Sequence, residues 1–384
     1  MLTIKNLPLY WRFTEVPSEH PKIPSVLDFT FDIDDKLGMI IEKKTSQLLT
    51  VLDEIYKADA NIGYMIDGHN LSASYGKDYI NFLKSIFGDF SNKRVVDVGC
   101  GGCTLLEHLK KQGANVLGVD PSPVALRAAK KKGISLINDF FSPGLIEDVS
   151  ADAILQMDVF EHIYDPVKLL SAEKQALKED GFIIINVPNC EYSVSQGDIS
   201  MAIPQHVNMY TKYSLCKLVE AAGLYVAKLE TSGYGSALYC AATKNKNKAT
   251  CWAEDFKHER EWVTSFFEKA QKRISRFENF LYTLNNPESV GYFIFQRSLP
   301  YTCAIGFSID KARFFDNNAL WKGKYLDGVP GKVENIDDFI QNPPPETIIM
   351  SNTFGSEIKN EILKTDDNLS VFLQEDIFNG KFTG

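Results

Sequence analysis

The chain has 384 residues, a formal net charge of −9, 44% hydrophobic residues and 24% charged residues. This length predicts about two to three domains, and the composition is that of a globular protein. The negative charge argues against nucleic acid as a partner, and no apolar run reaches the roughly 18 residues of a membrane helix. The first residues lack the apolar core of a signal peptide. We therefore expect a cytoplasmic protein without a nucleic-acid or membrane partner.

Seven cysteines are scattered along the chain. Their odd number and irregular spacing favour reduced thiols over a framework of disulfides. Cys100 and Cys103 form a C-x-x-C pair, which could bind zinc or act in redox chemistry. No second pair and no neighbouring Cys/His set completes a metal site. We expect no bound metal, and in particular no structural zinc in residues 1–99, which contain no cysteine.

Residues 1–88 predict a small N-terminal region. Apolar runs at 26–33 and 39–41 flank a short polar turn and predict a β-hairpin, and a helix is expected over 44–56. The block at 61–87 directly precedes the glycine turn described next, so we expect it to lie over the ligand as a lid. Within it, Tyr75 is a candidate to wall a pocket, and His69 is a weaker candidate for substrate contact.

The most informative segment is 94–120. An apolar run at 94–98 leads into a turn with Gly99 and Gly101, and a helix-like stretch and a second apolar run follow, closed by Asp120. This order predicts a strand, a tight turn, a helix and a parallel strand. Glycines let the backbone approach a ligand, and an acid about 20 residues later can accept both hydroxyls of a ribose. The alternative is a purely structural strand-to-helix turn.

The turn departs from the dinucleotide pattern in its third glycine, since Thr104 stands where pyrophosphate would meet the helix N-terminus. The pattern Asp-x-Gly-x-Gly-Gly, beginning at Asp97, resembles the first motif of the class I S-adenosylmethionine (SAM) methyltransferases. Cys103 departs from that family, which usually has glycine there. The resemblance implies that Asp97, Gly99 and Gly101 hold the methionine end of SAM and that Asp120 binds its ribose.

Later segments agree with that family in order and spacing over residues 94–243. Strands are expected at 134–137, 153–157, 182–187, 226–230 and 238–243, with a helix over 213–222. The resemblance implies an α/β fold with a seven-stranded Rossmann-like sheet that ends in a hairpin. It also implies cofactor contacts from Asp139, Phe140 and Met157. The Glu161-His162 pair looks like a family segment that shapes the cofactor pocket.

The predicted domain order is an N-terminal region at 1–88, a SAM-binding domain at 89–245, a long helix at 246–290 and a Rossmann-like α/β domain at 291–384. In this last domain, strands are expected at 301–307 and 347–351 and helices from 334 and over 356–363. The long amphipathic helix either packs on its own domains or forms a coil between two copies. The oligomeric state therefore stays open between a monomer and a homodimer.

This order of parts resembles the sugar C-methyltransferase family, which ends in a Rossmann-like domain. Asp316 and the loop Lys-Gly-Lys-Tyr-Leu-Asp-Gly at 322–328 match that domain's "Lys-Gly-x-Tyr-x-x-Gly" loop after an aspartate. Two features depart from the family. The N-terminal cysteines that usually hold zinc are missing, and a central Glu-His motif reads Gln205-His206 here. O-methylation therefore stays open beside C-methylation.

These residues predict SAM-dependent methyl transfer to a small molecule, with a sugar nucleotide or glycan precursor as the expected acceptor. His206 is the candidate general base, because imidazole titrates near neutral pH, and a histidine that only holds its loop is the alternative. Tyr210 is a second candidate to wall the acceptor pocket. Two other functions stay open, a non-catalytic SAM-binding protein and a nicotinamide-dependent oxidoreductase.

Overall fold

A computed structural model describes residues 1–58, 70–146, 151–351 and 354–380, with the side chains of 70–74 left out. His69 and part of the expected lid lie outside the described residues. The chain forms two compact units, each described here by itself. One unit comprises Met1–Phe31, Ser195–Gln205 and Ser265–Gly384, and the other comprises Asp32–Val194 and His206–Thr264. The four contiguous regions expected from the sequence stay a prediction, since each unit collects segments from several of them.

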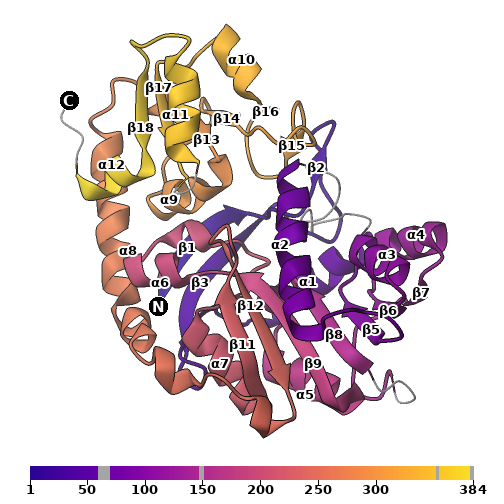
Figure 1. Ribbon diagram of the computed structural model, residues 1–384. Coiled ribbons are helices and arrows are strands. Elements are labelled where there is room, and N and C mark those ends of the chain that lie inside the picture. Colours follow the sequence, from indigo (N-terminus) through magenta and orange to yellow (C-terminus); the bar gives the residue numbers. More distant parts are fainter. Residues whose placement is uncertain (59–69, 147–150, 352–353, 381–384) are drawn as a thin grey trace. The chain divides into compact units, whose positions relative to one another are not determined.

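A seven-stranded sheet forms the centre of the second unit (Figure 1). Its order is β11-β12-β9-β8-β5-β6-β7. The strands are β5 (Arg94–Val98), β6 (Asn115–Val119), β7 (Ser135–Ile137), β8 (Ala151–Met157), β9 (Leu177–Pro188), β11 (Tyr225–Thr231) and β12 (Ala237–Thr243). β5 pairs in parallel with β6 and β8, whereas β12 runs antiparallel to both of its neighbours. The expected seven strands and final hairpin are therefore confirmed.

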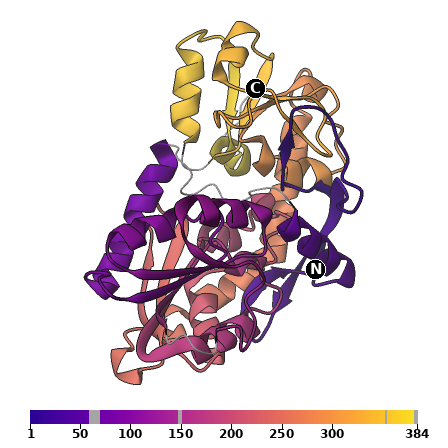
Figure 2. The same ribbon diagram turned by 90° about the vertical axis from the view of Figure 1, so that its right-hand side faces the viewer.

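Helices cover both faces of this sheet, and the alternation of side chains along β5 shows why. Val95 packs in one apolar cluster with residues of α2 and α3, and Val96 in another with residues of α5 and α7. Successive side chains of a strand point to opposite faces, so a strand buried on both sides reads as a continuous apolar run. The bounds are α2 (Asn70–Phe87), α3 (Thr104–Lys111), α4 (Pro123–Lys132), α5 (Pro166–Ala176) and α7 (Lys212–Ala221). Figure 2 shows the same sheet after a turn of 90°.

Three helices that start near the carboxyl edge of this sheet begin with side-chain caps. Ser122 accepts a hydrogen bond from the Ala125 amide at the start of α4, and Asp165 accepts one from Lys168 at the start of α5. At α7, Thr211 makes a capping box. Such caps satisfy amides that have no partner within the helix. They fix where each helix starts and so fix the loops that precede it.

A short strand pair holds the segment that carries His206. β4 (Met39–Glu42) pairs antiparallel with β10 (Asn208–Met209), and the amide of Glu42 donates to the carbonyl of Val207. α1 (Ser46–Lys57) follows β4. The amide group of Asn208 donates to the carbonyls of Phe160 and Ile163, at either end of the 3-10 turn η1 (Phe160–His162). The segment after β9 is therefore fastened to the segment after β8.

The first unit contains a five-stranded, all-parallel sheet of order β16-β14-β13-β17-β18. Its strands are β13 (Gly291–Phe293), β14 (Arg313–Phe315), β16 (Val333–Glu334), β17 (Glu346–Ile349) and β18 (Ser370–Leu373). Its helices are α9 (Leu299–Ala304), α10 (Ile336–Gln341), α11 (Gly355–Leu363) and α12 (Gln374–Asn379). β1 (Leu2–Pro8) pairs with β3 (Val26–Asp34), and β2 (Phe13–Thr14) pairs with β15 (Tyr325–Leu326).

Two expectations for this part of the chain are wrong. The strand expected at 301–307 is the helix α9, with Pro300 in its first turn and Gly306 in a left-handed conformation just after it. Proline fits the first turn of a helix, and glycine fits a left-handed residue after its end. The long helix is shorter than expected, because α8 (Glu259–Leu281) is preceded by a separate 3-10 turn at Ala253–Phe256.

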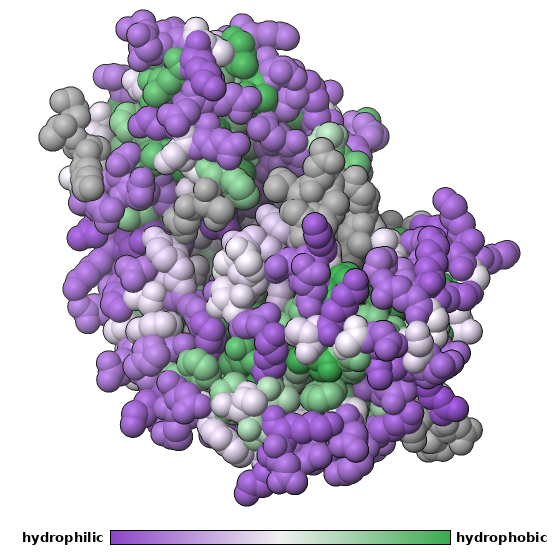
Figure 3. All heavy atoms as spheres, in the orientation of Figure 1, coloured by the Kyte–Doolittle hydropathy of each residue, from purple (hydrophilic) through white to green (hydrophobic). Residues whose placement is uncertain are grey.

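The surface of the described residues is mostly hydrophilic. On the face in Figure 3, apolar residues form small groups among polar ones. Exposed large apolar side chains such as Leu126, Tyr282 and Leu320 are spread along the chain, which is ordinary for globular proteins. Among the described helices, none combines the length and the apolar character that crossing a bilayer requires.

Candidate functional site

The glycine turn after β5 has the backbone conformation that the sequence predicted. Gly99 and Gly101 have φ angles of +73° and +45°, and the amide of Gly99 donates to the carbonyl of Val119 at 2.8 Å. Cys103 also has a positive φ, +54°, and stands directly before α3. Left-handed backbone explains why glycine is the usual residue there in the family that this motif resembles. A β-carbon on Gly99 would lie 2.6 Å from Cγ2 of Val159, so the segment after β8 packs directly on this turn.

Asp120, directly after β6, holds the glycine turn in place through its carboxylate. One carboxylate oxygen, Oδ2, accepts from the amide of Gly101 at 2.8 Å, and Oδ1 accepts from the amide of Ser122 at 2.8 Å. The Asn138 amide group donates to the backbone carbonyl of Asp120. The carboxylate is thus held in one orientation at the carboxyl edge of the sheet. Each oxygen has a further lone pair with which a ribose hydroxyl could bond.

The remaining predicted cofactor residues lie along the same edge. Asp139 and Phe140 follow β7 and are exposed, and the Phe140 ring lies 5.7 Å from Nζ of Lys57. Phe140 is 38% exposed, so one face of the ring is open to a flat ligand. Met157 is the last residue of β8 and is half-buried. Because β7, β6, β5 and β8 are parallel neighbours, these residues stand in one row, each at the carboxyl end of its strand.

Two further carboxylates belong to this part of the sheet edge, the buried Asp97 in β5 and the half-buried Asp158 directly after β8. Burial raises the pKa of Asp97 well above its usual range, and Cys103 and Asp120 add to the shift. Burial also raises the pKa of Asp158 to about 7. Asp158 has a left-handed φ of +54°, which costs a non-glycine residue energy and often marks a functional site. Among the described residues, no lysine or arginine forms an ion pair with either carboxylate. The sequence analysis missed Asp158, although its place directly after a central strand was a usable signal.

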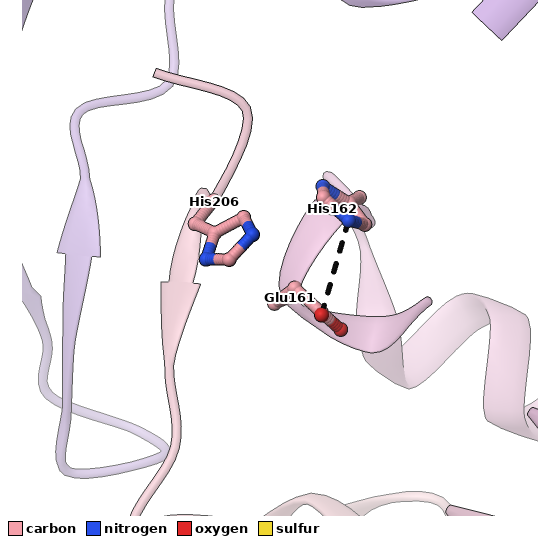
Figure 4. Close-up of side chains that lie close together, drawn as sticks. All are labelled: Glu161, His162 and His206. Atoms are coloured by element: carbon pink, nitrogen blue, oxygen red, sulfur yellow. Dashed lines mark ion pairs between the residues drawn. The ribbon is translucent and has the colours of Figure 1, made fainter. Parts of the chain in front are cut away.

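Glu161, His162 and His206 form a cluster next to this row (Figure 4). The two imidazole rings meet edge to face, with centroids 4.8 Å apart, and Nε2 of His162 lies 3.8 Å from Oε1 of Glu161. The backbone holds the cluster together, because the amide of Val207 donates to the carbonyl of Glu161 at 2.7 Å. Sequence reasoning named the Glu161-His162 pair and His206 separately. It could not bring them together, since they come from segments that are far apart in the chain.

The His206 ring of this cluster is held in its neutral form. Burial, together with the neighbouring His162, lowers the pKa of His206 well below its usual range, so His206 is neutral near pH 7 and a ring nitrogen can accept a proton. Burial raises the pKa of Glu161, and the charge of Asp158 adds to this. Its Oε2 atom is buried and has no hydrogen-bond partner among the described residues. The arrangement can therefore take up or pass on a proton.

The same donor set is also one that metals use. The ligand atoms of Glu161, His162 and His206 all lie within 4.8 Å of one another. Two imidazoles and a carboxylate are ligands for zinc and for other divalent cations. The expectation of no metal stays a prediction, and a titration with metal tests it directly.

The two tyrosines proposed as pocket walls have different surroundings. Tyr210 is fully buried, and its hydroxyl donates to the carbonyl of Phe160 at 3.3 Å. It supports the turn that carries Glu161, and a contact with a substrate would compete with that bond. Tyr75 is half-buried in α2, and its ring lies 4.0 Å from that of Tyr234. A wall role for Tyr75 stays a prediction.

Residues 69–229 match the model of a family described as "Methyltransferase domain". One curated relative, the ubiquinone biosynthesis O-methyltransferase of Dinoroseobacter shibae, is 32% identical over 172 residues, covering 40% of this chain and 66% of the relative. The enzyme of that name from Xylella fastidiosa strain M23 is 36% identical over 119 residues, which cover 29% of this chain and 47% of that enzyme. The chain thus spans about two thirds or less of the length of these two relatives.

Two solved structures that match part of this chain are methyltransferases. One is an S-adenosylmethionine dependent methyltransferase from Mesorhizobium loti, with a TM-score of 0.37 and 16% identity, covering 43% of this chain and 97% of that one. The other is the magnesium protoporphyrin IX methyltransferase of Synechocystis, solved with SAH bound. Its TM-score is 0.37 and its identity 15%, and the match covers 49% of this chain and 90% of that one. The α/β fold with its seven-stranded sheet is that of the class I methyltransferases.

Proposed function

We propose that this protein transfers a methyl group from SAM to a small-molecule acceptor. The observation that carries the proposal is one row of residues at the carboxyl edge of the sheet. The glycine turn, Asp120 and Asp139 stand at the ends of neighbouring strands, and the His206 cluster lies beside them. In open α/β sheets, ligands bind at this edge.

SAM supplies a methyl group on a positively charged sulfur that leaves as a neutral thioether. The chain's own contribution is mainly to hold the two reactants in line, because correct orientation lowers the barrier of a bimolecular displacement. Asp120 would fix the ribose, and the backbone at Gly99 and Gly101 would face the methionine end. His206 would take the proton that the acceptor loses, a role for which a neutral imidazole is suited.

The expected acceptor is a sugar nucleotide or a related glycan precursor. What supports it is the order of parts, with a second parallel α/β sheet in the C-terminal segment and the loop at 322–328 leading into β16. The relatives are named as ubiquinone biosynthesis O-methyltransferases, and this name favours a second candidate acceptor, a phenolic hydroxyl of a quinone precursor. The matches to these relatives cover only 40% and 29% of this chain, so we keep the sugar nucleotide as the first candidate.

The test is a transfer assay with purified protein, SAM and two acceptor panels, one of nucleotide sugars and one of hydroxylated aromatic acids. We expect a methylated nucleotide sugar and an equal amount of S-adenosylhomocysteine (SAH). A methylated phenol would move the acceptor to the second candidate. SAM binding without transfer to any acceptor would favour a non-catalytic binder, and binding of a nicotinamide cofactor in place of SAM would favour an oxidoreductase. A cytoplasmic location and the monomeric or dimeric state also stay predictions.

A further inference from the structure

Three carboxylates stand near the glycine turn, and only one of them has its hydrogen bonds satisfied. Asp120 accepts two backbone amide bonds. Asp97 and Asp158 accept no side-chain bond from the described residues, and no lysine or arginine of the described chain forms an ion pair with them. Asp97 is buried and Asp158 is half-buried, and removing a carboxylate from water without a partner is costly. This part of the sheet edge therefore favours a positively charged ligand.

A buried tyrosine points to the same place. The Tyr79 side chain is 1% exposed, and its hydroxyl has no hydrogen-bond partner among the described residues. Its ring packs on Tyr239, with the centroids 5.4 Å apart. Burial raises the pKa of Tyr79, and the charges of Asp97 and Asp158 add to the shift. A buried tyrosine hydroxyl normally has a partner, so this hydroxyl is available to bond a polar group of a ligand.

The order of the strands indicates which part of the cofactor would lie here. Asp139 follows β7, Asp120 ends β6, the glycine turn ends β5 and Asp158 follows β8, and these four strands are neighbours in this order. With ribose on Asp120 and adenine toward β7, the methionine end would extend the other way, over β5 and β8. Asp158 directly precedes Val159, which packs on the glycine turn, and comes shortly before Glu161 of the His206 cluster, so it belongs to the segment where the methyl group would meet the acceptor.

We propose that Asp158 and Tyr79 form an acidic arm of the cofactor site that faces the sulfonium of SAM and distinguishes SAM from its product. The inference depends on the proposed function, since it assumes that SAM is the ligand. SAM and SAH share adenine, ribose and a zwitterionic methionine end. They differ in the methyl group and in one positive charge on sulfur. A carboxylate at the sulfur therefore favours SAM and weakens the hold on SAH after the transfer.

The test compares calorimetric titrations of SAM and SAH against three proteins, the wild type, Asp158→Asn and Tyr79→Phe. Charge-assisted contacts contribute enough that their loss lowers affinity by about tenfold to a hundredfold. We expect Asp158→Asn to lower SAM affinity by about that factor and SAH affinity by less than about threefold. Tyr79→Phe removes only a hydroxyl and should move SAM affinity in the same direction by a smaller factor.

The matched control is Asp120→Asn, because the ribose is common to both ligands. We expect it to lower SAM and SAH affinity by the same factor. An equal loss of both ligands in Asp158→Asn would overturn the acidic arm while leaving the cofactor assignment intact. Unchanged binding of both ligands in Asp158→Asn and in Tyr79→Phe would overturn it as well. A wild-type protein that binds neither ligand would instead overturn the proposed function. Tyr79→Phe keeps the size and packing of the ring, so it decides the question if Asp158→Asn fails to fold.

Discussion

At the scale of single residues, the chemistry depends on side chains whose charge state is set by burial. The sequence predicted Asp97, Asp120 and His206 because each follows a recognisable pattern. It did not single out Asp158, whose place directly after a central strand was a usable signal, and it could not single out Tyr79, whose interest comes from a buried hydroxyl without a partner among the described residues. Likewise, Glu161 and His206 meet through the backbone bond from Val207 to Glu161, just before the two-residue strand β10, and so short a strand leaves almost no periodic signal.

His206 is expected to be the general base. His206→Ala should lower turnover by about 10²–10⁴-fold, the range for loss of a positioned base, and should leave SAM affinity nearly unchanged. Steady-state kinetics and a SAM titration measure the two effects. His108→Ala, on the exposed side of α3, is the control and should keep full activity. Wild-type turnover in His206→Ala would leave His206 as a residue that only holds its loop.

The Glu161 cluster is expected to work without a metal, and residues 1–99 to hold no structural zinc. Elemental analysis of purified protein should find no stoichiometric zinc, and the unfolding temperature should be the same with and without chelator. A stoichiometric metal that disappears in His162→Ala would make the cluster a metal site, with His206 as a ligand in place of a base.

At the scale of elements, the sequence predicted best where one local pattern determines the structure. The central strands are continuous apolar runs buried on both faces, and β5, α3 and β6 came out close to their expected bounds. The helix α9 was mistaken for a strand, because six apolar and small residues show too little of a helix to reveal its period. Short elements in the C-terminal segment are specified by packing more than by their own sequence.

The glycine turn offers a prediction with a built-in control. Gly99→Ala places a β-carbon on a left-handed residue and also 2.6 Å from Val159, whereas Gly235→Ala, at φ +83°, has nothing within 4 Å of the added carbon. Left-handed strain alone costs about 1–3 kcal/mol, so both variants should lose stability. Gly99→Ala should lose more, and it should also lose SAM binding. Denaturant unfolding measures the difference, and equal losses would show that Val159 does not constrain the turn.

At the scale of the whole molecule, buried acids make stability depend on pH. Burial raises the pKa of Glu42 from its unfolded value of 4.5 to about 9. The folded protein therefore keeps this proton over a range in which the unfolded chain has lost it. Stability from this group is complete below the unfolded pKa and is lost as pH rises toward about 9.

Glu42→Gln removes this dependence, because glutamine does not titrate. We expect the variant to be more stable than the wild type at pH 8, and we expect this advantage to shrink at pH 5. Chemical unfolding at both pH values measures it, with the exposed Glu179→Gln as the control. The same difference between variant and wild type at both pH values would mean that Glu42 is not held in its protonated form.

The central claim is that the carboxyl edge of the seven-stranded sheet binds SAM, and calorimetry on Asp120→Ala tests it most directly. Hydrogen bonds to a charged group contribute about 1.5–3 kcal/mol, and Asp120 also holds the amide of Gly101 in place. We predict one SAM per wild-type chain and a loss of affinity of about tenfold or more in the variant. Wild-type protein that binds no SAM, or a variant that binds it as tightly as the wild type, would contradict the account.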